Sequence, residues 1–194
     1  MDTILKAENI WKTYGSSSVK VNALNGIDLS FAKGRFYSVI GRSGSGKSTL
    51  LYVLSGLEKP TRGNVFFEGK DLSEYPDGQM AVFRRRHMGF VFQQYNLMEE
   101  YNVLENICMP LKLDQRKPDS GFLHTVLETL GLSDKQKKYA PELSGGEQQR
   151  VAIARSILSK PKIIFADEPT GNLDKKTALE TLELLIRSAK KFGQ

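Results

Sequence analysis

The feature that most constrains this chain is the stretch "GRSGSGKST", residues 41–49, which lies between an apolar β-prone run and a helical pattern. It matches G-x-x-x-x-G-K-[ST], a loop whose glycines let backbone N–H groups surround a phosphate at a helix N-terminus. A glycine-rich turn with an incidental lysine is the alternative, but it does not explain why a strand precedes the loop and a helix follows it. The sequence therefore predicts a phosphate-binding loop made of Gly41, Arg42, Ser43, Gly44, Ser45, Gly46, Lys47, Ser48 and Thr49.

Two side chains of this loop have predictable roles. Lys47 can neutralise the β- and γ-phosphates of a nucleotide, and the Ser48 hydroxyl can bind Mg²⁺. The run "KIIFADE", residues 162–168, delivers Asp167 and Glu168 at the carboxyl end of an apolar strand, where ligands bind in an open α/β sheet. We expect Asp167 to bind Mg²⁺ and Glu168 to polarise the attacking water. The alternative, that two acids merely start a turn before a proline, is disfavoured by the phosphate loop elsewhere in the chain.

Strands and helices alternate along the chain. Apolar β-rich runs predict strands, and apolar residues at helical spacing predict helices. The predicted strands are residues 3–11, 19–31, 35–41, 65–72, 88–94 and 162–168. The predicted helices are residues 49–57, 103–113, 120–131, 133–138, 144–158 and 175–191, of which the second to fourth form an inserted helical subdomain. This alternation implies an α/β fold with a mainly parallel sheet.

Composition limits the class of protein. The 194 residues are 40% hydrophobic and 26% charged, which is ordinary for one soluble globular domain with a real core. Cys108 is the only cysteine, so an internal disulfide is impossible and a reducing compartment is expected. The N-terminal residues lack the pattern of a signal peptide, and the longest apolar runs are too short to cross a bilayer.

The chain is basic, with a formal net charge of +6. This charge suits a nucleic acid, an anionic membrane surface or a phosphate ligand. The densest basic cluster, "RRRH" at residues 84–87, is interpreted as a solvated surface turn. Aromatic residues are not interleaved with basic ones as a single-strand binder requires, and we expect no nucleic-acid partner.

Five motifs occur in one order: "GRSGSGKST", "FVFQQ", "LSGGEQQR", "IIFADEPT" and "GNLD". In this order the chain resembles the ATP-binding subunit of an ATP-binding cassette (ABC) transporter from about residue 3 to its C-terminus. The motif forms are most similar to the lipoprotein-release, macrolide-export and cell-division branch. The resemblance implies a P-loop NTPase (RecA-like) core with an antiparallel β subdomain, together about residues 1–94 and 149–194, and a helical subdomain at about 95–148.

The resemblance also implies residue roles. Tyr14 stands where the family has an aromatic side chain that stacks on adenine; an ordinary edge-strand tyrosine is the alternative. Gln93 matches the glutamine that touches Mg²⁺ and the attacking water, although the adjacent Gln94 leaves a one-residue ambiguity. The following segment, residues 95–111, matches the contact with the membrane partner. Alternatively, its apolar residues belong to the subdomain core: Leu97, Val103, Leu104, Ile107 and Leu111.

The signature motif "LSGGE" comprises Leu143, Ser144, Gly145, Gly146 and Glu147. Ser144 and Glu147 have the spacing of a capping box, which fixes a helix start, and the two glycines leave amides open for a second anion. The resemblance implies that this motif binds the γ-phosphate of ATP held by the other subunit of a dimer, and that Asp174 reaches across the dimer interface.

These features together predict an ATP-hydrolysing subunit that uses Mg²⁺, forms a homodimer, and powers membrane permease subunits from the cytoplasmic face, in export or extraction from the membrane. A soluble ABC-type ATPase that acts on nucleic acid or ribosomes is the alternative, although such proteins usually carry two cassettes or a long coiled coil. A simple phosphate-loop kinase has no need of "LSGGE".

The sequence stops before the strand that carries the family's switch histidine, which neither His87 nor His124 matches, so we expect ATP binding with slow hydrolysis.

Overall fold

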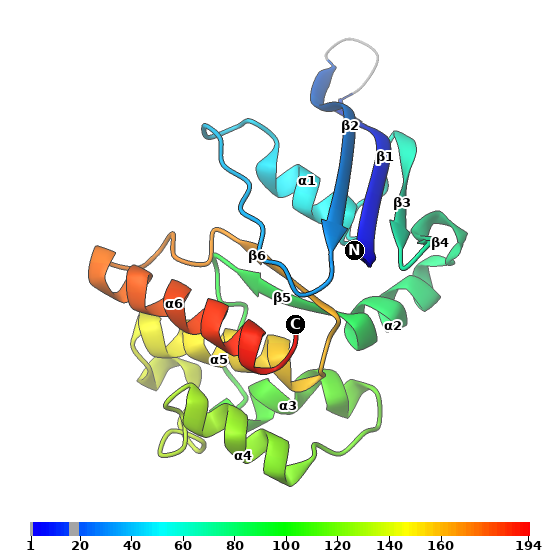
Figure 1. The fold of residues 1–194 in the computed structure, drawn as a ribbon. Helices are drawn as coiled ribbons and strands as arrows, with labels where there is room; N and C mark the ends of the chain where they lie inside the picture. The colour runs from blue at the N-terminus through cyan, green and yellow to red at the C-terminus, as the bar shows by residue number, and fades with distance from the viewer. Residues whose placement is uncertain (1, 16–19) are drawn as a thin grey trace. The chain divides into compact units, whose positions relative to one another are not determined.

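The computed structural model describes residues 2–15 and 20–194, which form two compact units, Met1–Arg84 and Arg85–Gln194. Figure 1 labels the secondary structure along the chain. The strands are β1 (Thr3–Tyr14), β2 (Val21–Ala32), β3 (Arg62–Phe67), β4 (Lys70–Asp71), β5 (Met88–Phe92) and β6 (Ile163–Asp167). The α-helices are α1 (Lys47–Leu54), α2 (Asp77–His87), α3 (Val103–Leu113), α4 (Ser120–Thr129), α5 (Gly145–Leu158) and α6 (Lys175–Lys191), with 3₁₀ turns at Leu72–Glu74 and Ala140–Glu142.

An antiparallel sheet of order β2-β1-β3-β4 forms the first unit, and α1 packs on β1 and β2. This confirms the antiparallel β subdomain that the family resemblance implied. β1 lies inside the sheet, between β2 and β3, so Tyr14 at its end is not on an edge strand. The turn between β3 and β4 consists of Glu68 (φ 48°) and Gly69 (φ 82°), both left-handed, as a tight two-residue hairpin turn requires.

The predicted strand at residues 35–41 does not form in this structure. Within the described residues no strand pairs with it, and Ile40 is 91% exposed. Within it, the Tyr37 hydroxyl accepts a hydrogen bond from the Ala32 amide at 2.9 Å, and the Tyr37 ring meets Phe31 edge-on. The prediction was wrong because β-propensity describes one segment, whereas a strand needs a neighbour to satisfy its backbone groups.

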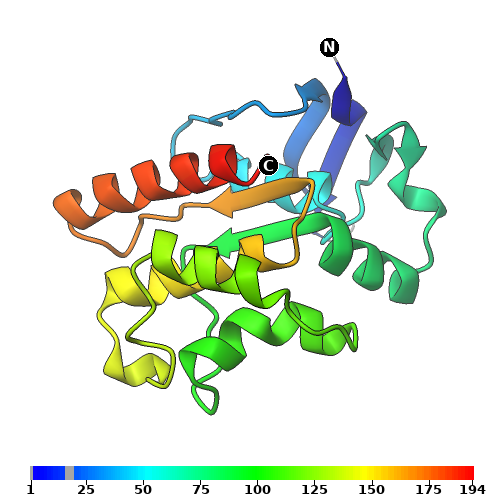
Figure 2. The same cartoon turned by 60° about the horizontal axis from the view of Figure 1, so that its bottom comes forward.

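The second unit is built around α5. Figure 2 shows β5 and β6 side by side and pointing the same way, with α5 along them. Helices α3, α4 and α6 contact α5 from other sides, and their apolar residues form one core with it. The parallel register sets Phe92 opposite Asp167, so the two strands end at the same level. This places the residues that follow β5 and β6 close together.

Two predicted features of the second half differ from the structure. The helix predicted at residues 133–138 does not form, and residues 133–137 are consecutive turns instead, because six residues are too few to offset the cost of nucleating a helix. The "RRRH" cluster is the last turn of α2, not a solvated turn, and its guanidinium groups have partners: Arg84 donates to the Gly56 carbonyl, and Arg85 and Arg86 both bind Asp114.

Candidate nucleotide-binding and hydrolysis site

The phosphate loop has the backbone that its glycines predict. Gly44 (φ 76°) and Gly46 (φ 88°) are left-handed, a conformation that side chains disfavour. A Cβ on Gly46 would lie 2.5 Å from the Ala23 carbonyl oxygen, so no larger residue fits there. Helix α1 begins directly after Gly46, which as the N-cap residue supplies no side-chain cap. The loop is therefore an exposed backbone cradle at a helix N-terminus, which suits a phosphate.

Lys47 lies across this cradle. Its Nζ donates to the carbonyl oxygens of Gly41 at 3.1 Å and Arg42 at 2.9 Å. The ammonium group is thus held inside the loop by neutral acceptors, which leaves its charge available to an anion. Ser48 follows in the first turn of α1, where its hydroxyl is a hard oxygen donor of the kind that Mg²⁺ prefers.

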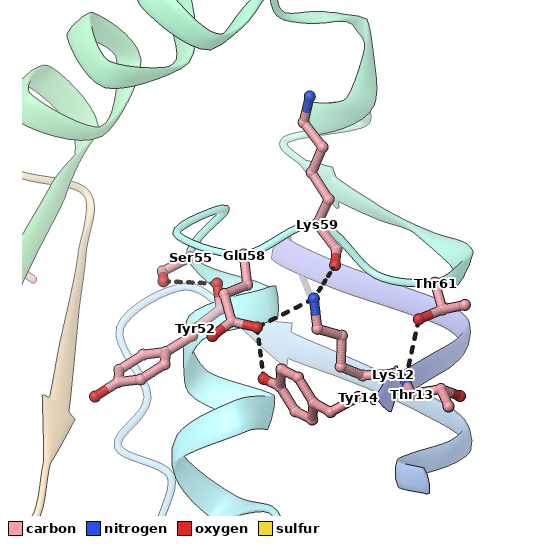
Figure 3. A network of polar contacts seen from close by, with 8 residues as sticks. All are labelled: Lys12, Thr13, Tyr14, Tyr52, Ser55, Glu58, Lys59 and Thr61. Carbon is pink, nitrogen blue, oxygen red and sulfur yellow. Dashed lines mark hydrogen bonds and ion pairs between the residues drawn. The ribbon is translucent and has the colours of Figure 1, made fainter. Parts of the chain in front are cut away.

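Tyr14 lies in the same unit as the loop, in the polar network of Figure 3. Its hydroxyl donates to Glu58 Oε2 at 2.5 Å, and Lys12 Nζ lies 3.1 Å from the same oxygen. Burial and the hydrogen bond to Glu58 raise the pKa of Tyr14, whereas a hydrogen bond with the Thr49 side chain lowers it. Tyr14, which is predicted to contact the base, and the predicted phosphate loop therefore lie in one unit. Thr49 of the loop joins them.

In the second unit, Gln93 follows β5 and is held by the loop after β6. Asn172 Nδ2 donates to the Gln93 carbonyl oxygen at 3.0 Å, and Gln93 Nε2 donates to Asn172 Oδ1 at 3.4 Å. A Cβ on Gly171 would lie 2.6 Å from Gln93 Nε2, so a larger residue there would displace the end of the Gln93 side chain. Gln94, in contrast, is exposed. The choice of Gln93 over Gln94 stays a prediction.

Asp167 ends β6, and Glu168 follows with φ 43°. A left-handed backbone at a residue other than glycine costs roughly 1–2 kcal/mol and often marks a functional site. The turn is held by the Gly171 amide, which donates to the Glu168 carbonyl at 3.0 Å, and by Gln149 Nε2, which donates to the Pro169 carbonyl at 2.5 Å. Glu168 is exposed to solvent.

The signature motif forms the predicted capping box. Ser144 Oγ accepts from the Glu147 amide at 3.3 Å, and Glu147 Oε2 accepts from the Ser144 amide at 2.8 Å. Hydrogen bonds from the Ser144 backbone and side chain, and then the charge of Lys135, lower the pKa of Glu147. The glycines also permit close packing, because a Cβ on Gly145 would lie 2.9 Å from the Tyr95 hydroxyl and one on Gly146 2.7 Å from Thr177 Cγ2.

Two of the predicted signature and interface residues have structural contacts of their own. Leu143 is buried in the core of the second unit, so its side chain does not face a ligand. Asp174 caps α6, since its Oδ1 accepts from the amides of Lys176 at 3.0 Å and Thr177 at 3.1 Å. A hydrogen bond from the Thr177 side chain and these amides lower the pKa of Asp174.

Most of the apolar residues in the segment after Gln93 belong to the core of the second unit. Val103, Ile107 and Leu111 are buried, Leu97 packs against the same core, and Leu104 is half-buried, as the structural alternative predicted. Asn106 organises the preceding loop: its amide nitrogen donates to three carbonyls, including that of Met98 at 3.0 Å, and its oxygen accepts from the Met98 amide at 2.8 Å.

Three residues of the site were not found by sequence reasoning: Glu58, Arg155 and Asn172. Arg155 lies on α5 and donates to the carbonyls of Tyr95 at 2.8 Å and Asn96 at 2.6 Å, which ties the segment after Gln93 to the signature helix. Burial lowers the pKa of its guanidinium. Each of these contacts joins segments that are tens of residues apart in the chain, and no local sequence pattern predicts them.

Comparison with known proteins identifies the family. The family profile described as "ABC transporter" matches residues 24–171. The lipoprotein-releasing system ATP-binding protein LolD of Geobacter metallireducens is 43% identical over 195 residues, covering 100% of this chain and 87% of the relative. The bacitracin export ATP-binding protein BceA of Halalkalibacterium halodurans is 44% identical over 182 residues, covering 92% of this chain and 72% of the relative.

A solved dimeric ATP-binding cassette, in a post-hydrolysis state bound to ADP and Pi, has 37% identity and a TM-score of 0.85. The match covers 98% of this chain and 84% of that one. Among the residues that the structure describes, none of the helices is both long and apolar enough to span a membrane.

Proposed function

Since this chain belongs to the ABC transporter family and is an ATP-binding and ATP-hydrolysing subunit that powers a membrane transporter, we propose that two copies close head-to-tail around two molecules of ATP. Each phosphate loop then faces the signature helix of the other copy. The single observation that best supports this arrangement is the second anion-suited helix start at Ser144, which a cassette with one nucleotide would not need.

Within each composite site we assign roles to individual side chains. The amides of residues 41–49 and the Lys47 ammonium hold the β- and γ-phosphates, and Tyr14 stacks on the base. Ser48, Gln93 and Asp167 offer hydroxyl, amide and carboxylate oxygens, a donor set that fits Mg²⁺. When bound, Mg²⁺ neutralises charge on the phosphate oxygens. Glu168 accepts a proton from the attacking water, and Asp174 contacts the other copy.

Closure of the dimer is the step that drives transport. ATP favours the closed state because only that state offers both the loop and the partner's signature helix to its phosphates. Hydrolysis removes the γ-phosphate and with it this preference, so the dimer reopens. The names of the relatives, a lipoprotein-releasing system and a bacitracin exporter, favour release or export as the direction.

We place the membrane contact at residues 95–102, on the cytoplasmic face. Asn106 and Arg155 hold the backbone of this loop by hydrogen bonds, while Met98 remains 48% exposed. An exposed methionine on a rigid loop suits a hydrophobic pocket in a permease subunit. The variant Met98→Asp should abolish co-purification with membrane proteins from the host cell and leave ATP binding intact; unchanged co-purification would place the contact elsewhere.

The head-to-tail arrangement is tested by mixing two inactive variants. Lys47→Ala removes the loop cation, while Ser144→Asp keeps a capping side chain but sets a negative charge against the partner's phosphate. In a mixed dimer one site keeps an intact loop and an intact signature helix, because the two defects fall together in the other site. We expect ATPase activity to return on mixing. If the loop and signature helix of one chain served the same nucleotide, mixing would restore nothing.

A further inference from the structure

The network around Tyr14 carries an inference that rests on the proposed role of this residue as the base platform. Glu58 is the centre of the network, since one of its carboxylate oxygens accepts from the Tyr14 hydroxyl at 2.5 Å and lies 3.1 Å from Lys12 Nζ. Figure 3 shows all three side chains converging on this point. The Tyr14 ring is therefore held at its hydroxyl end by a charge-assisted hydrogen bond.

Lys12 fixes a second side of the ring. Its Nζ lies over the Tyr14 ring, 5.1 Å from the centroid, and donates to the Lys59 carbonyl at 2.8 Å. A cation over one face is itself attracted to the ring. Tyr14 is still 38% exposed, so part of the residue remains accessible to a planar base.

Glu58 is also tied to α1, the helix that follows the phosphate loop. Its backbone amide donates to the Tyr52 carbonyl at 3.0 Å, and Tyr52 lies on α1, the helix that begins at Lys47 in the loop. The ionised state of Glu58 is maintained: burial acts to raise the pKa of its carboxyl, but hydrogen bonds from Tyr14 and Lys12 outweigh it and lower the pKa. Glu58 thus links α1, which its backbone amide contacts, to the end of β1, which its carboxylate contacts.

We propose that Glu58 is a positioning residue for nucleotide binding, which orients the Tyr14 ring as a one-sided platform for the purine base. It touches neither base nor phosphate. Its effect is therefore confined to ligands that carry a base, and a ligand made of phosphates alone does not sense it. This dependence on the base separates a positioning role from a general contribution to folding.

The test compares the affinities of ATP and inorganic triphosphate for the whole chain by calorimetry. Glu58→Gln and Tyr14→Phe each disturb the same hydrogen bond. We expect each variant to weaken the affinity for ATP about three- to tenfold, which is the effect of losing one hydrogen bond. The affinity for triphosphate should stay unchanged. Because both act on one contact, the double variant should be little weaker than either single variant.

Glu8→Gln is the matched control, because Glu8 also pairs with a lysine of β1, Lys6, but in an exposed position. It should change neither affinity. Equal losses for ATP and triphosphate in Glu58→Gln, or no loss of ATP in either single variant, would overturn the inference.

Tyr14→Ala separates this inference from the proposed function. If Tyr14→Ala weakens the affinity for ATP while Glu58→Gln and Tyr14→Phe do not, Tyr14 binds the base and the proposed role of Glu58 is wrong. If Tyr14→Ala leaves ATP affinity unchanged, the base platform itself is wrong, and the inference fails with it.

Discussion

Asn172 and Gln93, 79 residues apart in the chain, bind each other through two hydrogen bonds, one to the Gln93 backbone and one to its side chain. Asn172 belongs to the loop after β6, and Gln93 to the end of β5. The pair closes the parallel strands at the level where Asp167 and Glu168 emerge. It therefore sets where the Gln93 amide points.

Asn172→Ala should reduce ATP turnover about three- to tenfold while ATP affinity stays within twofold, because a positioned side chain matters most in the chemical step. Steady-state kcat and the equilibrium Kd of ATP measure the two effects separately. Gln136→Ala removes an amide that bonds only a local carbonyl and should change neither value. A loss of ATP affinity equal to the loss of turnover would show that Asn172 supports folding rather than Gln93.

Gly46→Ala should be far more damaging than Gly44→Ala. Both glycines are left-handed, so either substitution costs roughly 1–2 kcal/mol of backbone strain. Only at Gly46 would the new Cβ also meet backbone, 2.5 Å from the Ala23 carbonyl oxygen, whereas Gly44 has nothing within 4 Å. Denaturant unfolding should therefore show the larger loss for Gly46→Ala, with ATP binding lost. Equal stability of the two variants would contradict this geometry of the loop.

Asp114 should make the second unit sensitive to acid. Hydrogen bonds from Arg86 and then Arg85 lower the pKa of its carboxyl from 3.8 to about 2, and its side chain is only 3% exposed. Because the folded state has the lower pKa, the stabilisation is complete above the unfolded pKa near 4 and is lost as the pH falls toward 2. Asp114→Asn should flatten the pH dependence of unfolding in that window and lower stability at neutral pH.

The control for this prediction is Asp134→Asn, because Asp134 also contacts a neighbouring lysine but is largely exposed. It should leave both the stability at neutral pH and the acid transition unchanged. An Asp114→Asn variant with the acid transition of the unmodified chain would contradict the assignment of that transition to Asp114.

Features that depend on neighbouring residues could be predicted from the sequence. The phosphate loop, the Ser144–Glu147 capping box, the turn at Glu68 and the bounds of α6 were all predicted, since backbone conformation and capping act over a few residues. The family order of the motifs added the roles that local physics does not supply.

Features that depend on a distant partner could not be predicted. Residues 35–41 have a strand's composition, but no strand of the described part of the chain pairs with them, and the arginines at 85 and 86 look solvated until Asp114 is placed beside them. The contact of Glu58 with Tyr14 likewise spans 44 residues and has no local signature. Only the tertiary structure brings such side chains together.

ATP should join two copies of this chain, and light scattering of the Glu168→Gln variant tests this dimer most directly. Removing the carboxylate that we propose activates the water, while keeping every proposed phosphate contact, should preserve ATP binding and stop the cycle in its closed state. We predict a mass of 21.8 kDa without nucleotide and twice that value with Mg-ATP. A variant that binds ATP to saturation yet remains at the monomer mass would contradict closure of a head-to-tail dimer.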